Sequence, residues 1–231
     1  MAKQPQGKAT RKPKRKSAGQ AETADARQAR IIDTAMACIA RDGWRRFSLA
    51  QVATETGLPL AEILIPFPTK HAVINAFQDR IDERMLAATD DLVSAGDDGG
   101  NMRDRLFDLL MERFDALSPY RAAMAEIAKD ALCDPASLRF VPRMARTMSR
   151  VLEAAGIGTS GPVRLLQTKG LALVYADAFR VWLRDDSPDL AKTMAALDRG
   201  LRRAEKAMQF LCSARRRTPS DTDASTDSPS A

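Results

Sequence analysis

The sequence is poor in the residues that build metal sites and catalytic triads. Its 231 residues include one histidine, His71, and three cysteines, Cys38, Cys133 and Cys212. A zinc site needs several closely spaced His or Cys ligands, and a Ser-His-Asp triad needs a histidine beside its nucleophile. We therefore expect no metal, no cofactor and no catalytic residues, and hence no enzyme. An odd number of cysteines without metal-type spacing favours a reduced, cytoplasmic chain.

Aromatic residues and long apolar runs are also scarce. Aromatic residues make up 5% of the chain, and no apolar run approaches the ~20 residues that a membrane span needs. The basic N-terminus lacks the apolar segment of a signal peptide. Alanine, leucine, arginine and methionine are plentiful, and these residues favour helices over strands. The composition therefore predicts an all-α protein.

Positive charge is concentrated at the N-terminus. Residues 1–20 contain seven Lys and Arg and no acid, while the whole chain carries +6, so the remainder has a net charge of −1. We predict that residues 1–24 form a disordered basic arm that follows DNA phosphates or enters a minor groove. The alternative is a solubilising tail, or one that touches ribosomes or anionic lipid nonspecifically. The candidate DNA-contacting residues of the arm are Arg11, Lys12, Lys14, Arg15 and Lys16.

A helix and a capped short helix are predicted after this arm. The apolar stripe that includes Ile31 and Ile39 predicts a helix that ends at Gly43, a residue able to adopt the left-handed conformation. Ser48 is a good N-cap, and Gln51 three positions later completes a capping box. The sequence therefore predicts a short helix over residues 49–56.

A second short helix and a long one complete the pattern. Gly57 ends the first short helix, and residues 59–65 form the next one. Pro66 and Pro68 stop it, and Thr69 caps a long helix that starts near Lys70. Two short helices joined by a Gly-containing turn predict a helix-turn-helix.

The order of these parts resembles the DNA-binding unit of the TetR family of transcriptional regulators. The resemblance implies a TetR-like, all-α fold of about nine helices, with an N-terminal helix-turn-helix and a C-terminal bundle for ligand binding and dimerisation. It also implies that Lys70 matches a family lysine that contacts the DNA backbone. The matching residues are Ile31-Ile32-Asp33-Thr34-Ala35, Asp42-Gly43-Trp44, Phe47-Ser48-Leu49-Ala50-Gln51-Val52-Ala53, Gly57-Leu58 and Phe67-Pro68-Thr69-Lys70.

The second short helix departs from that family. Base edges are read by hydrogen bonds from Arg, Lys, Asn, Gln, Ser or Thr, and this helix contains none of them. We place Leu60, Ala61 and Glu62 in the base-facing position, with Ser48, Thr69 and Lys70 as candidate phosphate contacts. One interpretation is DNA binding with poor base readout. The other is a helix-turn-helix that is kept as a packing module and no longer reads sequence.

The rest of the chain reads as helices that form a second domain. We predict an N-terminal DNA-binding domain over residues 25–96, a bundle over residues 101–212 and a disordered tail over residues 213–231. In the last helix, apolar residues recur in alternating steps of four and three, a heptad seam. The seam predicts a homodimer through the last two helices, with burial inside one subunit as the alternative. The seam residues are Leu190, Met194, Leu197, Leu201, Ala204, Met208 and Leu211.

The C-terminal third also resembles a second family, the coenzyme Q biosynthesis accessory proteins, which use a TetR-like fold to bind lipid. The matching residues are Thr168-Lys169, Leu171-Ala172, Val174-Tyr175, Trp182-Leu183, Asp186-Ser187-Pro188-Asp189, Thr193 and Leu197-Asp198-Arg199. Either family implies a ligand inside the C-terminal helices, where Met and aromatic side chains can adapt to apolar shapes. The candidate wall residues are Phe107, Met111, Phe114, Met124, Met144, Met148, Tyr175, Phe179 and Trp182.

Two functions follow from these patterns. The first is a TetR-type DNA-binding regulator, homodimeric, in which a small apolar effector changes the spacing of two helix-turn-helix units. The alternative is a lipid- or quinone-intermediate-binding accessory protein of ubiquinone biosynthesis that has lost operator recognition. DNA, a lipid or apolar effector, and a second copy of the chain are therefore the predicted partners.

Overall fold

The computed structural model describes residues 23–94, 101–131, 140–158 and 160–216, and every regular element in this part of the chain is a helix. The basic arm, residues 95–100 and 132–139, and the end of the C-terminal tail lie outside the described residues. The helices are α1 (Ala24–Asp42), α2 (Leu49–Thr56), α3 (Leu60–Leu64), α4 (Lys70–Ser94), α5 (Met102–Leu117), the 3-10 turn η1 (Ser118–Tyr120), α6 (Arg121–Ala131), α7 (Phe140–Ala154), α8 (Gly161–Trp182) and α9 (Ala191–Arg216).

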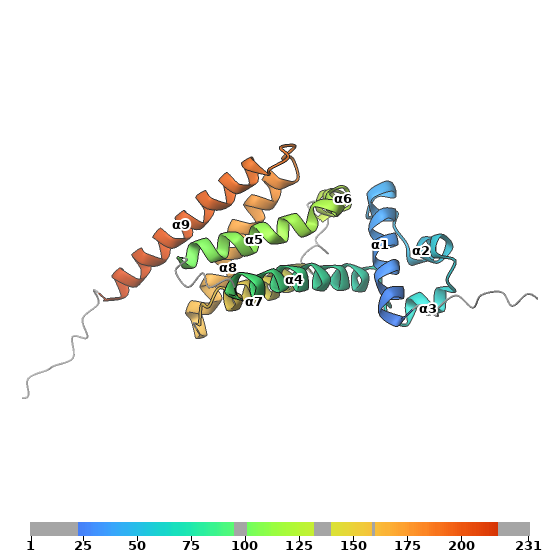
Figure 1. Cartoon of the computed structure of the whole chain (residues 1–231), viewed down its shortest axis with the longest axis horizontal. Coiled ribbons are helices and arrows are strands. Elements are labelled where there is room, and N and C mark those ends of the chain that lie inside the picture. Colours follow the sequence, from blue (N-terminus) through green and yellow to red (C-terminus); the bar gives the residue numbers. More distant parts are fainter. Residues whose placement is uncertain (1–22, 95–100, 132–139, 159, 217–231) are drawn as a thin grey trace, which may run out of the picture.

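The helices divide into a small unit and a bundle joined by α4. Figure 1 shows α1, α2 and α3 together at one end of the molecule, with α5, α7, α8 and α9 at the other. The long helix α4 runs from the small unit into the bundle, and α6 packs against α1. Apolar side chains from both parts belong to one continuous core, in which Phe77 of α4 and Phe114 of α5 are fully buried. The two parts are therefore packed together rather than linked by a free hinge.

Local capping interactions set the bounds of the small helices. Gly43 ends α1 with φ at 83°, in the left-handed region, and Gly57 follows α2 with φ at 68°. At the start of α2, the Gln51 N–H donates to Ser48 Oγ (3.4 Å) and the Ser48 N–H donates to Gln51 Oε1 (2.8 Å). This is the capping box that the sequence predicts.

Asp185 fixes the connection between α8 and α9. Its carboxylate accepts hydrogen bonds from the Thr193 N–H (2.8 Å), the Thr193 hydroxyl (2.7 Å) and the Ser187 N–H (3.2 Å), and also from the Ser187 hydroxyl. Burial by itself would raise the pKa of Asp185, but the hydrogen bonds from Ser187 and Thr193 outweigh it and hold the pKa well below its usual value. The ionised form therefore stabilises the start of α9.

Helices α8 and α9 lie side by side in close contact. A Cβ atom added at Gly200 of α9 would lie 2.7 Å from Val174 Cγ1 of α8, so only glycine fits there without a shift. Of the heptad seam, Leu190, Leu197 and Leu201 are buried in the chain's own core. That part of the seam packs inside one subunit, whereas Met194, Ala204 and Met208 are half-buried and the side chain of Leu211 lies outside the described residues. The homodimer through the last two helices stays a prediction.

Pro142 is the third residue of α7, within its first turn, where proline is tolerated. None of the described helices combines the length and the apolar composition that crossing a membrane requires.

Candidate functional site

The first candidate site is the helix-turn-helix formed by α2 and α3, which α1 holds in place. Arg41 at the end of α1 pairs with Glu55 of α2 at 2.6 Å, and Arg30 donates to the Thr56 carbonyl oxygen at 3.0 Å. Val52 of α2 and Ile63 of α3 are fully buried in the core between these helices. These contacts fix the angle between the two short helices.

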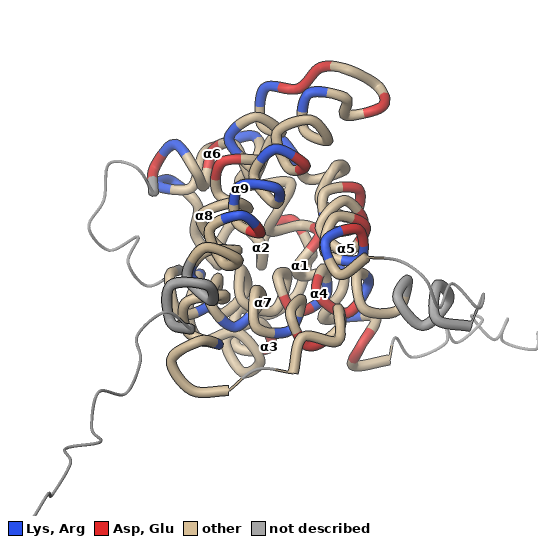
Figure 2. Tube along the Cα trace, turned by 90° about the vertical axis from the view of Figure 1, so that its left-hand side faces the viewer, with Lys and Arg blue, Asp and Glu red and all other residues tan. Residues whose placement is uncertain are grey.

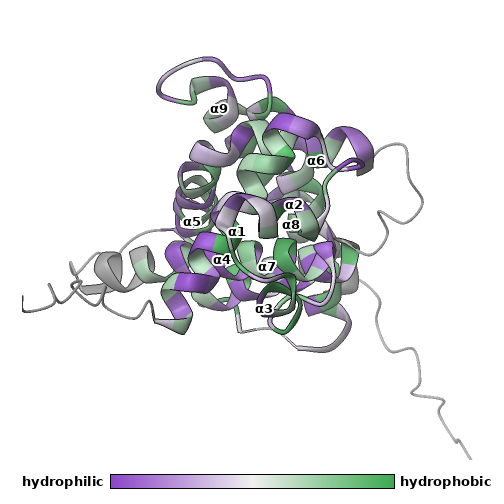
Figure 3. Cartoon of the chain, turned by 90° about the vertical axis from the view of Figure 1, so that its right-hand side faces the viewer, coloured by the Kyte–Doolittle hydropathy of each residue, from purple (hydrophilic) through white to green (hydrophobic). Residues whose placement is uncertain are grey.

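The outer face of α3 is apolar. Ile63 belongs to the core, but Leu60 is 41% exposed, Leu64 40% and Ile65 83%. Figure 3 looks onto this end of the molecule and shows α3 as a hydrophobic segment. Of the base-facing candidates, Leu60 and Ala61 are exposed and Glu62 is half-buried. The outer face of α3 therefore presents apolar side chains to a duplex but no side chain that donates a hydrogen bond.

Glu62, the one charged residue of α3, is paired. Its Oε2 accepts from Arg27 Nη1 of α1 at 2.9 Å, and both side chains are about two-fifths exposed, at 42% for Glu62 and 40% for Arg27. A neighbouring guanidinium reduces the repulsion that a carboxylate would feel from DNA phosphates. The pair therefore removes part of the electrostatic cost of an acid in this position.

Lys70 is held at the N-terminus of α4 by Trp44. Its Nζ donates to the Trp44 carbonyl oxygen at 3.2 Å and lies 4.4 Å from the centre of the indole ring. Thr69 is exposed, and its Oγ1 caps α4 by accepting from the Ala72 N–H at 3.1 Å. Ser48 is exposed as well. The predicted phosphate contacts thus lie at the starts of α2 and α4, while Arg11, Lys12, Lys14, Arg15 and Lys16 lie outside the described residues.

The second candidate site is a half-open cavity of about 720 Å³ lined by residues of α4, α5, α6, α7 and α8. Of the predicted wall residues, Met124, Met144, Tyr175 and Phe179 line it. Phe114, Met148 and Trp182 lie in the core, each with no exposed surface. Phe107 and Met111 pack against that core and are not among the described residues that line the cavity.

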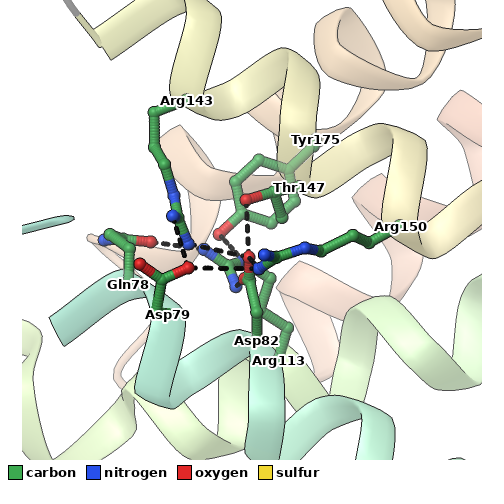
Figure 4. A network of polar contacts seen from close by, with 8 residues as sticks. All are labelled: Gln78, Asp79, Asp82, Arg113, Arg143, Thr147, Arg150 and Tyr175. Carbon is green, nitrogen blue, oxygen red and sulfur yellow. Dashed lines mark hydrogen bonds and ion pairs between the residues drawn. The ribbon is translucent and has the colours of Figure 1, made fainter. Parts of the chain in front are cut away.

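A charged cluster forms the inner wall of this cavity (Figure 4). Asp82 of α4, which is completely buried, accepts from Arg143 Nη2 (2.9 Å), Arg150 Nη1 (3.1 Å) and Thr147 Oγ1 (3.0 Å), and also from Arg113 Nη1. Asp79, one turn earlier, accepts from Arg143 at 2.6 Å and from Arg150 at 3.2 Å. Gln78 and Tyr175 complete the cluster through Arg113.

The protonation states in the cluster follow from burial and from the guanidinium groups. Burial opposes ionisation of Asp79, but the hydrogen bond and charge of Arg143, with those of Arg150, lower the pKa of this carboxyl. Burial raises the pKa of Tyr175 against the opposing charge of Arg113. Asp79 is therefore a carboxylate and Tyr175 a neutral phenol near neutral pH.

Sequence reasoning missed the polar wall, although a signal was present. Arg143, Thr147 and Arg150 follow one another at spacings of four and three, and Gln78 and Asp82 are four apart. Such spacings place side chains on one face of a helix. Charged residues are rarely buried unless they are paired, and the spacing does not show which residues would pair with this stripe.

Comparison with solved structures decides the fold family. The chain superposes on a TetR transcriptional regulator from Nitrosomonas europaea with a TM-score of 0.64 and 29% sequence identity, over 78% of this chain and 98% of that one. A TetR transcriptional regulator from a Rhodococcus species gives a TM-score of 0.55 and 20% identity, over 78% and 96%. The chain has the fold of the TetR transcriptional regulators. No protein-family model and no curated protein sequence matches it.

The likeness confirms the predicted all-α, TetR-like fold. The resemblance to the coenzyme Q accessory proteins stays a prediction. In this TetR-like chain, two helices connect the cavity with the helix-turn-helix unit. Helix α4 lines the cavity through Ile74, Asn75 and Gln78 and begins at Lys70, four residues before Ile74.

Helix α6 makes the second connection. It lines the cavity through Met124, Ile127 and Lys129, and its Asp130 pairs with Arg45, just after α1, at 3.2 Å. Asp130 also accepts from the Arg45 backbone N–H at 3.1 Å. Helix α6 is therefore joined by direct contacts to the residue that follows the end of α1.

Proposed function

We propose that this chain is a TetR-type transcriptional regulator that binds DNA as a homodimer and responds to a ligand in the bundle cavity. The observation that carries the proposal is the helix-turn-helix on α1 and α4, whose outer face is exposed, in a chain with 29% identity to a TetR regulator over nearly all of that regulator's length. No other described surface combines two short helices with exposed helix starts.

DNA contact in this proposal is mainly with the phosphate backbone. Exposed Ser48 and Thr69 lie at the starts of α2 and α4, where backbone N–H groups favour anions, and Lys70 adds a positive charge beside them. Leu60 and Ala61 can contact thymine methyl groups in the major groove. The basic arm, with Arg11, Lys12, Lys14, Arg15 and Lys16, supplies further phosphate contacts that carry no sequence choice.

The bundle supplies a dimer surface rather than a second DNA surface. Figure 2 shows Lys and Arg interspersed with Asp and Glu along α9 and α5, so the electrostatic potential at this end of the molecule is not of one sign. On α8, Leu166 is 46% exposed and Leu173, two turns later on the same face, is 74% exposed; Phe210 of α9 is 71% exposed. Isolated exposed apolar side chains are ordinary, but a stripe of them fits a second copy of the chain.

The cavity is the proposed effector site. Because α4 and α6 both line it and both contact the helix-turn-helix unit, a ligand that prefers one position of these helices would favour one spacing of the two units in a dimer. A ligand shifts such an equilibrium only by its difference in affinity for the two states.

Fluorescence anisotropy with DNA duplexes tests the DNA-binding proposal. Lys70→Ala should weaken binding by several-fold at low salt and lower the salt dependence by about one ion, because one phosphate contact is lost. Lys192→Ala, an exposed lysine on α9, is the matched control and should leave affinity unchanged. Equal affinity for Lys70→Ala and the unmodified chain, together with binding that disappears when residues 1–20 are deleted, would show that only the arm binds DNA.

One observation favours the alternative, an accessory protein that binds lipid or a quinone intermediate. The exposed face of α3 is formed by Leu60, Leu64 and Ile65, which suit an apolar partner as well as a groove. Native mass spectrometry separates the two functions. A co-purifying isoprenoid or phospholipid, with no sequence-dependent DNA binding, would support the accessory protein; apo protein that retains a DNA footprint would support the regulator.

A further inference from the structure

The charged residues that line the bundle cavity are all cations, although Arg113, Arg143 and Lys129 each pair with an acid behind the lining. Among the described residues that line it are five cations, Arg113, Lys129, Arg143, Arg180 and Arg184, and no Asp or Glu. Lys129, Arg180 and Arg184 are exposed at the rim, whereas Arg113 and Arg143 are 1% and 8% exposed in the wall. A cavity with low-dielectric walls and charge of one sign attracts ligands of the opposite sign.

The cluster behind the wall does not balance its own charge. Three guanidinium groups, those of Arg113, Arg143 and Arg150, contact two carboxylates, those of Asp79 and Asp82. One positive charge is therefore left in excess among these five side chains, of which Arg113, Arg143 and Asp82 are buried, whereas Arg150 and Asp79 are 39% and 42% exposed. Buried charges are normally paired because desolvation of an unpaired charge is costly. A monoanion in the cavity would complete the pairing.

Two hydrogen-bond donors on this wall are unused. The Arg143 Nε–H is buried and has no partner among the described residues, although both terminal nitrogens of Arg143 are paired with Asp79 and Asp82. The Tyr175 hydroxyl accepts from Arg113 Nε at 3.2 Å, and the described residues offer no acceptor for its own proton. A buried donor without a partner costs about 1–3 kcal/mol and is uncommon in native structures. Both donors would gain an acceptor from a carboxylate bound at this wall.

The cavity lining also includes apolar side chains. Ile74, Met124, Met144 and Phe179 line it, and Met and aromatic side chains adapt to flexible apolar groups. We propose that the cavity takes an amphipathic monoanion, an apolar body that carries one carboxylate, with the carboxylate at Arg143 and Tyr175. This inference rests on the proposed role of the cavity as an effector site, and it names the chemical class of the effector.

A series of ligands with one alkyl chain and three head groups tests the inference on the full-length, unmodified chain. Decanoate, 1-decanol and decyltrimethylammonium are titrated by isothermal titration calorimetry at neutral pH. Decanoate should bind roughly 10- to 100-fold more tightly than decanol, the range expected for one charge-assisted hydrogen-bonded contact. The cation should bind more weakly than decanol. Decanol binding as tightly as decanoate, tighter binding of the cation, or no binding of any of the three would overturn the inference.

Variants locate the head group. Arg143→Gln should reduce decanoate affinity roughly 10- to 100-fold, to the level of decanol, and leave decanol affinity unchanged. Arg180→Gln, which removes an exposed rim cation, is the matched control and should reduce decanoate affinity by less than about threefold. If Arg143→Gln does not fold, Tyr175→Phe serves in its place with a smaller loss of the same selectivity. Unchanged head-group preference in the folded variant would overturn the assignment.

DNA binding measured in the same samples separates this inference from the proposed function. Preferential decanoate binding without any effect on DNA affinity would support the ligand class and refute the effector role. Release of DNA by decanoate and decanol alike would support the effector role and refute the anionic ligand class.

Discussion

Asp82→Asn should be among the most destabilising single changes in the bundle. The side chain keeps its volume but loses its charge, and Asp82 accepts from three guanidinium groups while having no exposed surface. Removing one partner of a buried ion pair costs about 3–5 kcal/mol, because the remaining charge stays buried and unpaired. For a chain of this size, each kcal/mol lowers Tm by roughly 2–4 °C, which predicts a fall of roughly 6–20 °C.

Urea unfolding followed by circular dichroism, together with thermal melts, measures this loss. Asp79→Asn is the graded control, because it is the same substitution one turn away on α4 in a side chain that is 42% exposed. Its cost should be about 1 kcal/mol or less, since water screens part of the interaction. The reasoning about the cluster is refuted if Asp82→Asn costs less than about 1 kcal/mol, or if the two variants are equally destabilised.

Three further changes test other parts of the structure. Asp185→Asn should cost roughly 1–3 kcal/mol at neutral pH by loss of the ionised cap. Folding lowers the pKa of Asp185, so the stability difference between the variant and the unmodified chain should be complete above about pH 4 and decline as the pH falls below that value. A stability difference that is independent of pH down to the acid transition would contradict the capping role. Glu62→Gln should tighten DNA binding by a few-fold in anisotropy measurements at low salt, because a charge repelled by phosphates is removed; unchanged affinity would show that α3 does not face DNA. Gly170→Ala adds a Cβ that meets nothing within 4 Å, so this variant should be more stable by about 1 kcal/mol in urea unfolding. Gly200→Ala should be less stable by roughly the same amount, because its Cβ clashes with α8. Equal effects of the two substitutions would mean that the contact between α8 and α9 is not tight.

The local structure of the N-terminal unit could be predicted from the sequence because it is determined by neighbours in the chain. The Ser48–Gln51 capping box and the glycines at 43 and 57 act over three or four residues and need no tertiary information. The bounds of α2 follow directly from them. At α3, the sequence pattern showed the absence of donors, but burial of Ile63 depends on how the helices around it pack.

The charged wall of the cavity could not be predicted in the same way. Asp82, Arg113 and Arg143 lie on three different helices, and their pairing is set by the packing of α4, α5 and α7. Sequence periodicity showed which residues share a face but gave no partner for that face. The same limit applied to the heptad seam of α9, whose period left two interpretations open and did not show that Leu197 and Leu201 lie in the core of the subunit.

The most direct measurement of the central claim is a selection of duplexes from a random DNA pool with the full-length chain. The account predicts enrichment of a palindrome with two half-sites about one helical turn apart, and loss of that enrichment in Lys70→Ala. The account would be contradicted if no sequence is enriched, if binding requires only residues 1–20, and if Lys70→Ala has no effect.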